Sequence, residues 1–227
     1  GSVSVTNYRD QGYLPQALVN FLALLGWAPE EKKELFTMEE LIAEFSLSRV
    51  SKSPAVFDLD KLKWLNGQYL HQLDLDQVVA GITPYLDDSM TQNTASLQLL
   101  AATLQNHLLC FSDVKEFMPL IQGELPQWDA ECAAIMQKEQ VPGLLCLFAK
   151  SLFALPEMTP EEVKKTLKAC GKELGVKGAD LFMPVRIAAT GMQHGPDIDK
   201  LIALMGKNVL DQRLTESFAR LQIIKSW

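Results

Sequence analysis

The sequence predicts an all-α fold, because apolar residues recur at helical spacing almost throughout the chain and strand-like alternation is nearly absent. Residue types that start or stop helices lie at the ends of most of these periodic segments. We therefore expect a multi-helix bundle of two helical subdomains, with the boundary between Leu86 and Thr91 and the smaller subdomain first.

The N-terminal part contains three predicted helices. The apolar face Leu14–Leu25 forms the first, and Gly26 ends it. Thr37 opens a capping box that starts the second helix. Asp58 caps the third, which we expect to end at Asn66-Gly67 because this pair suits a left-handed helix terminus. Trp64 of this third helix lies at helical spacing, so we assign its side chain to the core.

The middle of the chain continues in the same way. Asp74 opens a helix that stops before Pro84, since proline restricts the residue before it. The helices expected next are Thr91–Leu109, Asp113–Gln122, Trp128–Lys138 and, after a break at Pro142-Gly143, Leu144–Phe153.

The C-terminal third begins with a strongly marked helix. Thr159 caps it, Pro160 occupies its first position and Gly175 closes it. Its expected inward side chains are those of Val163, Leu167, Cys170 and Leu174, and its outward ones are those of Lys164, Lys165, Lys168 and Lys172. Three more helices are expected: one ending at Thr190-Gly191, one starting at His194-Gly195-Pro196, and a last one over Val209–Ile223.

Composition and charge fit a globular protein with an uneven charge distribution. The 227 residues are 48% apolar and carry a net charge of −7, which argues against nucleic acid as a partner. However, residues 161–227 hold 11 Lys+Arg against 8 Asp+Glu, whereas residues 1–160 hold 10 against 20. The basic C-terminal third is compatible with phosphate binding or with a solvated helix face.

Motifs for catalysis or metal binding are missing. The four cysteines and three histidines lack metal-ligand spacing, and no phosphate-binding loop, dinucleotide fingerprint or nucleophile elbow is present. We expect no catalytic residue, no metal ligand and no cofactor. No apolar run is long enough to span a bilayer and no leader pattern is found, so a cytoplasmic location without membrane contact is expected.

One loop concentrates polar chemistry. The segment Ser48–Ser53 holds two cations and three hydroxyls just before Pro54. Hydroxyls, cations and backbone amides are the groups that bind phosphate oxygens. Phosphate binding and a merely solvated loop both remain open for this segment.

Two blocks resemble the bacterial glutamate–tRNA ligases. SVSVTNYRDQGYLPQALVNFLALLGW with LFTMEELIAEFSLSRVSKSPAVFDLDKLKWLNGQYL is similar to their helical stem-contact region, and MPVRIAATGMQHGPDIDKLIALMGK is similar to the end of their anticodon-binding region. The resemblance implies a stem-contact subdomain at residues 1–88 and an anticodon-binding subdomain at 89–227. It also implies that the catalytic domain, with its ATP and magnesium, lies outside this chain, and leaves open whether Gly1-Ser2 is native.

The resemblance also implies which residues contact tRNA. Arg49, Ser51 and Lys52 match a segment near the inner side of the bent tRNA. Arg186 matches a position used for anticodon recognition, with a helix-face cation as the alternative. The loop and helix start packed around the anticodon bases correspond to Gly195, Pro196 and Ile198.

One position departs from the family pattern. Many members carry an arginine before the segment FSDVKEF that helps to select the third anticodon base, and the nearest candidate here is His107. Without that arginine, glutamine tRNA becomes a second candidate partner beside glutamate tRNA. The alternative is that His107 is a histidine of the core.

The expected partners are therefore tRNA and the ligase's own catalytic domain, with the protein a monomer. Two other interpretations remain. One is an all-α adaptor that docks partner helices in apolar grooves, which the acidic N-terminal part favours. The other is a small enzyme with an unrecognised site.

Overall fold

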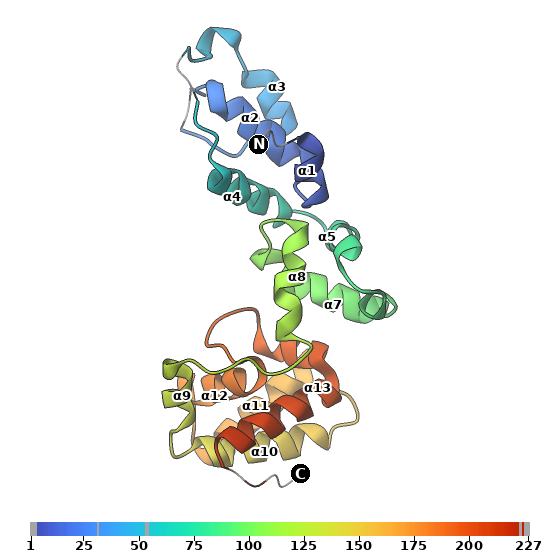
Figure 1. Cartoon of the computed structure of the whole chain (residues 1–227), viewed down its shortest axis with the longest axis vertical. Helices are drawn as coiled ribbons and strands as arrows, with labels where there is room; N and C mark the ends of the chain where they lie inside the picture. The colour runs from blue at the N-terminus through green and yellow to red at the C-terminus, as the bar shows by residue number, and fades with distance from the viewer. Residues whose placement is uncertain (1–3, 31, 53–54, 223, 225–227) are drawn as a thin grey trace. The chain divides into compact units, whose positions relative to one another are not determined.

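The computed structural model describes residues 4–30, 32–52, 55–222 and 224 (Figure 1). Within these ranges the regular structure is helical, apart from one isolated bridge between Trp27 and Val50. The all-α prediction is confirmed. The chain forms two compact units, unit 1 over residues 1–116 and unit 2 over residues 117–227.

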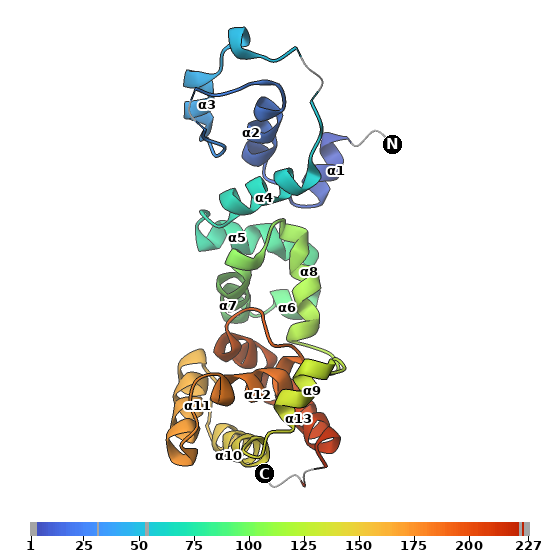
Figure 2. The same ribbon diagram turned by 90° about the vertical axis from the view of Figure 1, so that its left-hand side faces the viewer.

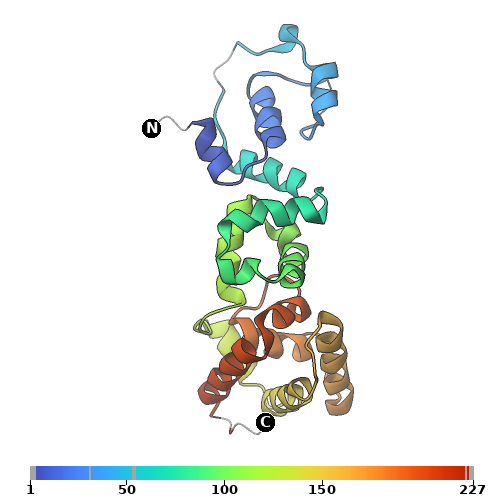
Figure 3. The same cartoon turned by 90° about the vertical axis from the view of Figure 1, so that its right-hand side faces the viewer.

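Unit 1 consists of short helices and 3₁₀ turns. It contains α1 (Val5–Asp10), α2 (Pro15–Gly26), α3 (Met38–Glu44), α4 (Leu59–Leu70), α5 (Leu75–Ile82), α6 (Asp88–Thr91), α7 (Thr94–Leu104) and the start of α8 (Val114–Phe117), with 3₁₀ turns at Leu47–Arg49, Thr83–Tyr85, Gln105–His107 and Phe111–Asp113. Helix α2 packs on α4. Helix α5 packs on α7 in the green part of Figure 3.

The expected helix starts in unit 1 are confirmed by their caps. The Thr37 hydroxyl accepts a hydrogen bond from the Glu40 amide (3.2 Å), and the Glu40 carboxylate accepts one from the Thr37 amide (2.8 Å). The Asp58 carboxylate accepts from the amide of Lys61 at 3.1 Å. Helix α2 ends at Gly26, as predicted.

The expected end of α4 at Asn66-Gly67 is wrong, because the helix runs on to Leu70. The buried Asn66 side chain accepts from the Leu14 amide (2.8 Å) and donates to the Leu109 carbonyl (2.5 Å). A Cβ on Gly67 would lie 2.7 Å from a methyl group of Leu109. The pair resembles a helix terminus in sequence but serves as a packing site for a distant segment.

The helices of the middle are shorter than predicted. Helix α7 starts only at Thr94, where the Asn93 side chain accepts from the Ser96 amide at 3.1 Å. The helix expected over 113–122 is instead the short helix α8 followed by a proline-containing 3₁₀ turn, Met118–Leu120.

The functional division of the chain at residues 88 and 89 stays a prediction. The compact units divide later, after Glu116, because α7 packs against α5 of the same unit.

Unit 2 is a bundle of longer helices. It contains α9 (Ala130–Met136), α10 (Val141–Phe153), α11 (Pro160–Leu174), α12 (Ala179–Thr190) and α13 (Ile198–Arg220). Helix α11 packs on α10 and α13, and α12 packs on α13 and α9 (Figures 1 and 2). The break expected at Pro142-Gly143 is wrong, because Pro142 lies in the first turn of α10, where its missing N–H costs nothing.

Helix α11 matches its prediction closely. The Thr159 hydroxyl accepts from the Glu162 amide at 3.2 Å, and Gly175 ends the helix in a left-handed conformation. The four lysines are exposed and the expected inward residues are buried, except Leu174, which is 40% exposed in the last turn.

Helix α13 consists of two helical parts, as the two predicted helices require. Gly206 interrupts it with φ 67° and ψ 175°, a conformation open almost only to glycine. The second part ends at Arg220, and Ile223, its expected end, lies outside the described residues.

One buried cation holds unit 2 together. Arg213 of α13 is 1% exposed, and its guanidinium donates hydrogen bonds at 2.7–2.8 Å to the carbonyl oxygens of Pro119, Leu120, Gln122 and Ala189. The Ser217 hydroxyl, one turn later, donates to the Ala188 carbonyl at 3.1 Å. Carbonyls in the last turn of a helix lack intrahelical donors, so α13 supplies donors for the end of α12.

Arg213→Met should therefore destabilise unit 2. The substitution leaves several buried carbonyls without a donor, and we expect the free energy of unfolding to fall by about 3 kcal/mol or more. Hydrogen exchange of the α12 and α13 amides measures this loss of stability. Lys164→Met, which removes an exposed cation from α11, is the matched control. Equal exchange rates in the two variants would show that the carbonyl contacts contribute little.

Candidate nucleic-acid interface

The structure brings Arg186, Gly195, Pro196 and Ile198 together in unit 2. Arg186 lies on α12, and its Nη2 donates to the Pro196 carbonyl at 3.0 Å. Gly195 has φ 137°, and a Cβ on it would lie 3.7 Å from Nη1 of Arg186. The turn between α12 and α13 is therefore folded against this guanidinium.

The Arg186 guanidinium keeps one donor unused. Its Nη1 is buried and has no hydrogen-bond partner among the described residues. Burial lowers the pKa of Arg186, while Asp197 and Asp199 act to raise it. Arginine stays charged under such conditions because its pKa is so high. A buried, charged donor without an acceptor can bind an oxygen or ring nitrogen of a ligand.

The loop that carries the turn is anchored on both sides. The Thr190 hydroxyl donates to the Arg186 carbonyl (2.8 Å) and accepts from the Met192 amide (3.2 Å). The Gln193 side chain donates to the Glu131 carboxylate of α9 at 3.0 Å. These contacts fix the path from α12 into the turn.

The start of α13 completes the cluster. Ile198, its first residue, is buried, so its side chain anchors the helix. Asp197 precedes the helix and pairs with Lys200 at 2.9 Å. The first amides of α13 have no earlier helical carbonyl and lie next to the turn.

Arg49, Ser51 and Lys52 lie in unit 1, apart in sequence from this cluster. The Arg49 guanidinium contacts its own chain: Nη2 donates to the Glu44 carbonyl (3.3 Å), Nη1 lies 3.2 Å from a Glu30 carboxylate oxygen, and the group lies over the Trp27 ring. The Ser51 amide donates to the Gly26 carbonyl at 2.6 Å. Ser51 and Lys52 are exposed, and Ser53 and Pro54 lie outside the described residues.

His107 is exposed at the end of a 3₁₀ turn in unit 1. The alternative of a core histidine is therefore wrong. The core assignment of Trp64 is wrong as well, because 44% of its surface is accessible. Its position among apolar residues on α4 gives no signal of this exposure.

Sequence reasoning also missed a basic hollow in unit 2. Lys168, Lys172 and Lys177 line a depression of about 420 Å³ between α11 and α12, beside the partly exposed ring of Phe182. The lysine spacing on α11 was visible in the sequence. The turn that closes the hollow was not, because it depends on Gly171, where a Cβ would lie 2.6 Å from a methyl group of Leu181.

Metal and membrane features are absent from the described ranges. There, no group of three or more His, Cys, Asp or Glu side chains is arranged to hold a metal ion. None of the described helices is long and apolar enough to cross a membrane.

Comparison with known proteins assigns the chain. The family model "Anticodon binding domain" matches residues 77–218, which is more than half of the sequence. The chain belongs to the anticodon-binding domain family. A second model, "tRNA synthetases class I (E and Q), catalytic domain", matches residues 1–64.

Relatives of this chain confirm the resemblance seen in the sequence. It is 42% identical over 215 residues to a glutamate–tRNA ligase of Heliobacterium modesticaldum, covering 91% of this chain and 43% of the relative. It is also 42% identical to the Bacillus subtilis glutamate–tRNA ligase, covering 92% of this chain and 45% of the relative. The chain thus spans less than half the length of these relatives.

A solved structure has the same fold. The crystal structure of a glutamate tRNA ligase from Elizabethkingia meningosepticum superposes with a TM-score of 0.79 at 24% identity, covering 94% of this chain and 43% of the other. At this identity the likeness shows the fold alone.

The geometry of the turn can be tested through two glycines. Gly195→Ala should lower stability by about 1–2 kcal/mol, because its φ of 137° is unfavourable for a residue with a Cβ. Gly143→Ala should raise it by up to about 1 kcal/mol, since Gly143 is helical and its Cβ would meet nothing within 4 Å. Thermal unfolding of both variants checks the pair. A Gly195→Ala variant as stable as the unaltered chain would contradict the strained turn.

Proposed function

We propose that this chain binds glutamate tRNA and recognises its anticodon through Arg186 and the turn at residues 194–197. The observation that carries the proposal is the buried Nη1 of Arg186, which has no hydrogen-bond partner among the described residues. A planar guanidinium with a free donor edge suits the edge of a nucleic-acid base. RNA-binding proteins read sequence mainly on unpaired bases of this kind.

The arrangement fixes the guanidinium before RNA arrives. The Pro196 carbonyl holds Nη2 at 3.0 Å, so little side-chain freedom is lost on binding. Burial makes the added hydrogen bond stronger than it would be in water. Gly195 supplies a surface without a side chain, and the amides at the start of α13 add donors. Together with Arg186 they would form the binding site for one base.

Unit 1 would position the tRNA rather than read it. We propose that Ser51 and the exposed Lys52 contact backbone phosphate, with the Ser51 amide fixed by Gly26. The role of Arg49 is to hold this loop, because its guanidinium contacts Glu44, Glu30 and Trp27. The stem-contact role of residues 1–88 and the anticodon role of residues 89–227 belong to the same proposal.

The lysine hollow on α11 is consistent with this function. Its cations add to the positive balance of the C-terminal third, and phosphate contacts of this kind make binding weaken as salt is added.

In the longer ligases that this chain resembles, we propose that it serves a catalytic domain that uses ATP and magnesium to activate glutamate and join it to tRNA. The same proposal includes a cytoplasmic location and a monomeric state. Positioning and discrimination act on such a reaction through binding energy.

A second candidate function is the adaptor, and the apolar groove between α2 and α3 favours it. An adaptor would bind a partner helix there and show no anticodon preference. Binding experiments with RNA separate the two functions.

We expect two single-cation variants to affect RNA binding differently. Arg186→Gln should weaken binding of both an anticodon stem-loop and the whole tRNA by about 10- to 100-fold, because a hydrogen bond from a charged donor is worth about 1.5–3 kcal/mol. Lys52→Gln should weaken binding of the whole tRNA and leave the stem-loop unaffected. Fluorescence titration of labelled RNA measures both.

The two variants control for each other, since each removes one positive charge. Equal losses for Arg186→Gln and Lys52→Gln on every RNA would indicate general charge attraction only. No loss for Arg186→Gln would refute the proposed role of the turn.

Discrimination between tRNAs is tested separately. With His107 in place of the selecting arginine, we expect Kd values for glutamate and glutamine tRNAs to lie within about fivefold of each other, because the missing contact would supply about 1–3 kcal/mol. His107→Arg should shift the preference towards glutamate tRNA. A large preference of the unaltered chain for glutamate tRNA would exclude acceptance of glutamine tRNA.

A further inference from the structure

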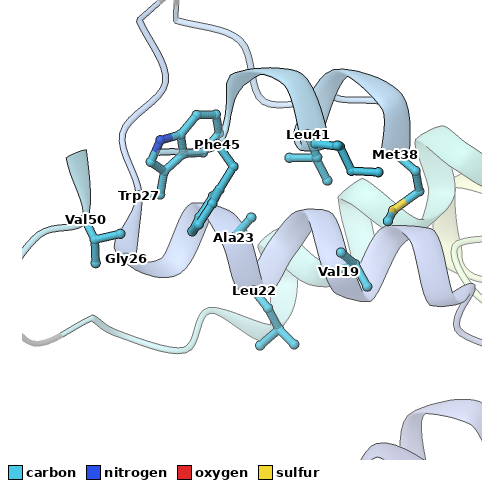
Figure 4. A pocket seen from close by; sticks show the side chains of 10 residues that line it. Val19, Leu22, Ala23, Gly26, Trp27, Met38, Leu41, Phe45 and Val50 are labelled. Atoms are coloured by element: carbon cyan, nitrogen blue, oxygen red, sulfur yellow. The ribbon is translucent and has the colours of Figure 1, made fainter. Parts of the chain in front are cut away.

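Unit 1 carries an open apolar groove between α2 and α3 (Figure 4). Its volume is about 570 Å³, and apolar side chains of both helices line it together with Val50. Several are well exposed: Ile42 is 78% accessible, Leu22 48% and Phe45 44%. The described part of the chain provides no cover for these side chains.

Such a concentration of exposed apolar surface is unusual on a protein that functions alone. Single exposed leucines are common, but a continuous patch usually marks a contact surface. Covering it removes apolar area from water, which is the main favourable contribution to most protein association. The groove is therefore suited to an apolar partner surface.

The groove also has a polar end. Trp27 lines it, and the indole Nε1 of Trp27 is buried with no hydrogen-bond partner among the described residues. The Arg49 guanidinium lies over the Trp27 ring, and its Nη1 is paired with the Glu30 carboxylate at 3.2 Å. The unused indole donor at this end favours a partner that brings an acceptor there, such as the carbonyls at the carboxyl end of a helix.

The family models indicate which partner this is. All the residues that line the groove lie between 19 and 50, inside the segment 1–64 that matches the class I synthetase catalytic domain. The glutamate–tRNA ligases that resemble this chain are more than twice as long as the matched region. The groove thus lies in a segment that matches a catalytic-domain model, in a chain that spans less than half the length of these relatives.

We propose that the α2–α3 groove is the docking surface for the remainder of a class I catalytic domain, which covers it with apolar side chains and places a backbone acceptor near the Trp27 indole. The inference rests on the part of the proposed function that places this chain within a longer ligase, and it is independent of the anticodon contacts. Docking there would tie the stem-contact loop at Ser51 and Lys52 to the domain that receives the tRNA end.

A chimera tests the proposal. The chimera is the Bacillus subtilis ligase in which this chain replaces the segment that it matches. That segment makes up 45% of the ligase. We expect the amides of α2 and α3 to exchange hydrogen more slowly in the chimera than in the separate chain, by about tenfold or more. Ile42→Asp should lower the melting temperature of the chimera by about 3 °C or more and leave that of the separate chain nearly unchanged.

Val56→Asp is the matched control, because Val56 is 84% exposed and lies outside the groove. Equal effects of Ile42→Asp and Val56→Asp on the chimera would overturn the proposal. So would unprotected α2 and α3 in a folded chimera, or failure of the chimera to fold where the unaltered Bacillus ligase does. A dimer of the separate chain that Ile42→Asp dissociates would assign the groove to a second copy instead.

Binding of the anticodon stem-loop by the separate chain distinguishes this test from the proposed function. Loss of α2–α3 protection with stem-loop binding intact would refute only the docking surface. Loss of stem-loop binding with protection intact would refute only the anticodon role.

Discussion

The hydrogen bonds of Arg213 determine how unit 2 is assembled. This guanidinium lies in the interior, where an unsolvated charge is very costly, and backbone carbonyls from two segments solvate it in place of water. One of them, the Ala189 carbonyl, lies near the end of α12, three residues after Arg186. The position of the proposed base-reading arginine therefore depends on a second arginine that contacts no RNA in the proposal.

Buried polar groups have the same role in unit 1. Asn20 of α2 is fully buried, donates to the Glu34 carbonyl at 3.0 Å and accepts from the Phe36 amide at 2.8 Å, while the Tyr69 hydroxyl donates to its side-chain oxygen at 2.7 Å. Each contact satisfies a backbone or hydroxyl group that would otherwise be buried without a partner. Networks of this kind favour one arrangement of the helices over other compact ones.

Features that depend on neighbours in sequence were predicted well. The caps at Thr37, Asp58 and Thr159 follow from local patterns. Features that depend on distant contacts were not. Asn66-Gly67 continues a helix because Leu109 packs on it, and Arg213 has the spacing of an ordinary surface cation although four carbonyls surround it. Nothing in the sequence around Arg49 indicates that its guanidinium pairs with Glu30 and lies over the Trp27 ring.

The interruption of α13 at Gly206 separates two parts of the helix that have different neighbours. The helical part before it begins at the turn that faces Arg186, and the part after it carries Arg213 and Ser217. Because the backbone changes direction at a glycine, a substitution that shifts the first part need not shift the second. Under the proposed function, a substitution in the first part could change the recognised base while the hydrogen bonds of Arg213 and Ser217 stay unaltered, so that specificity and fold would change independently along the same helix.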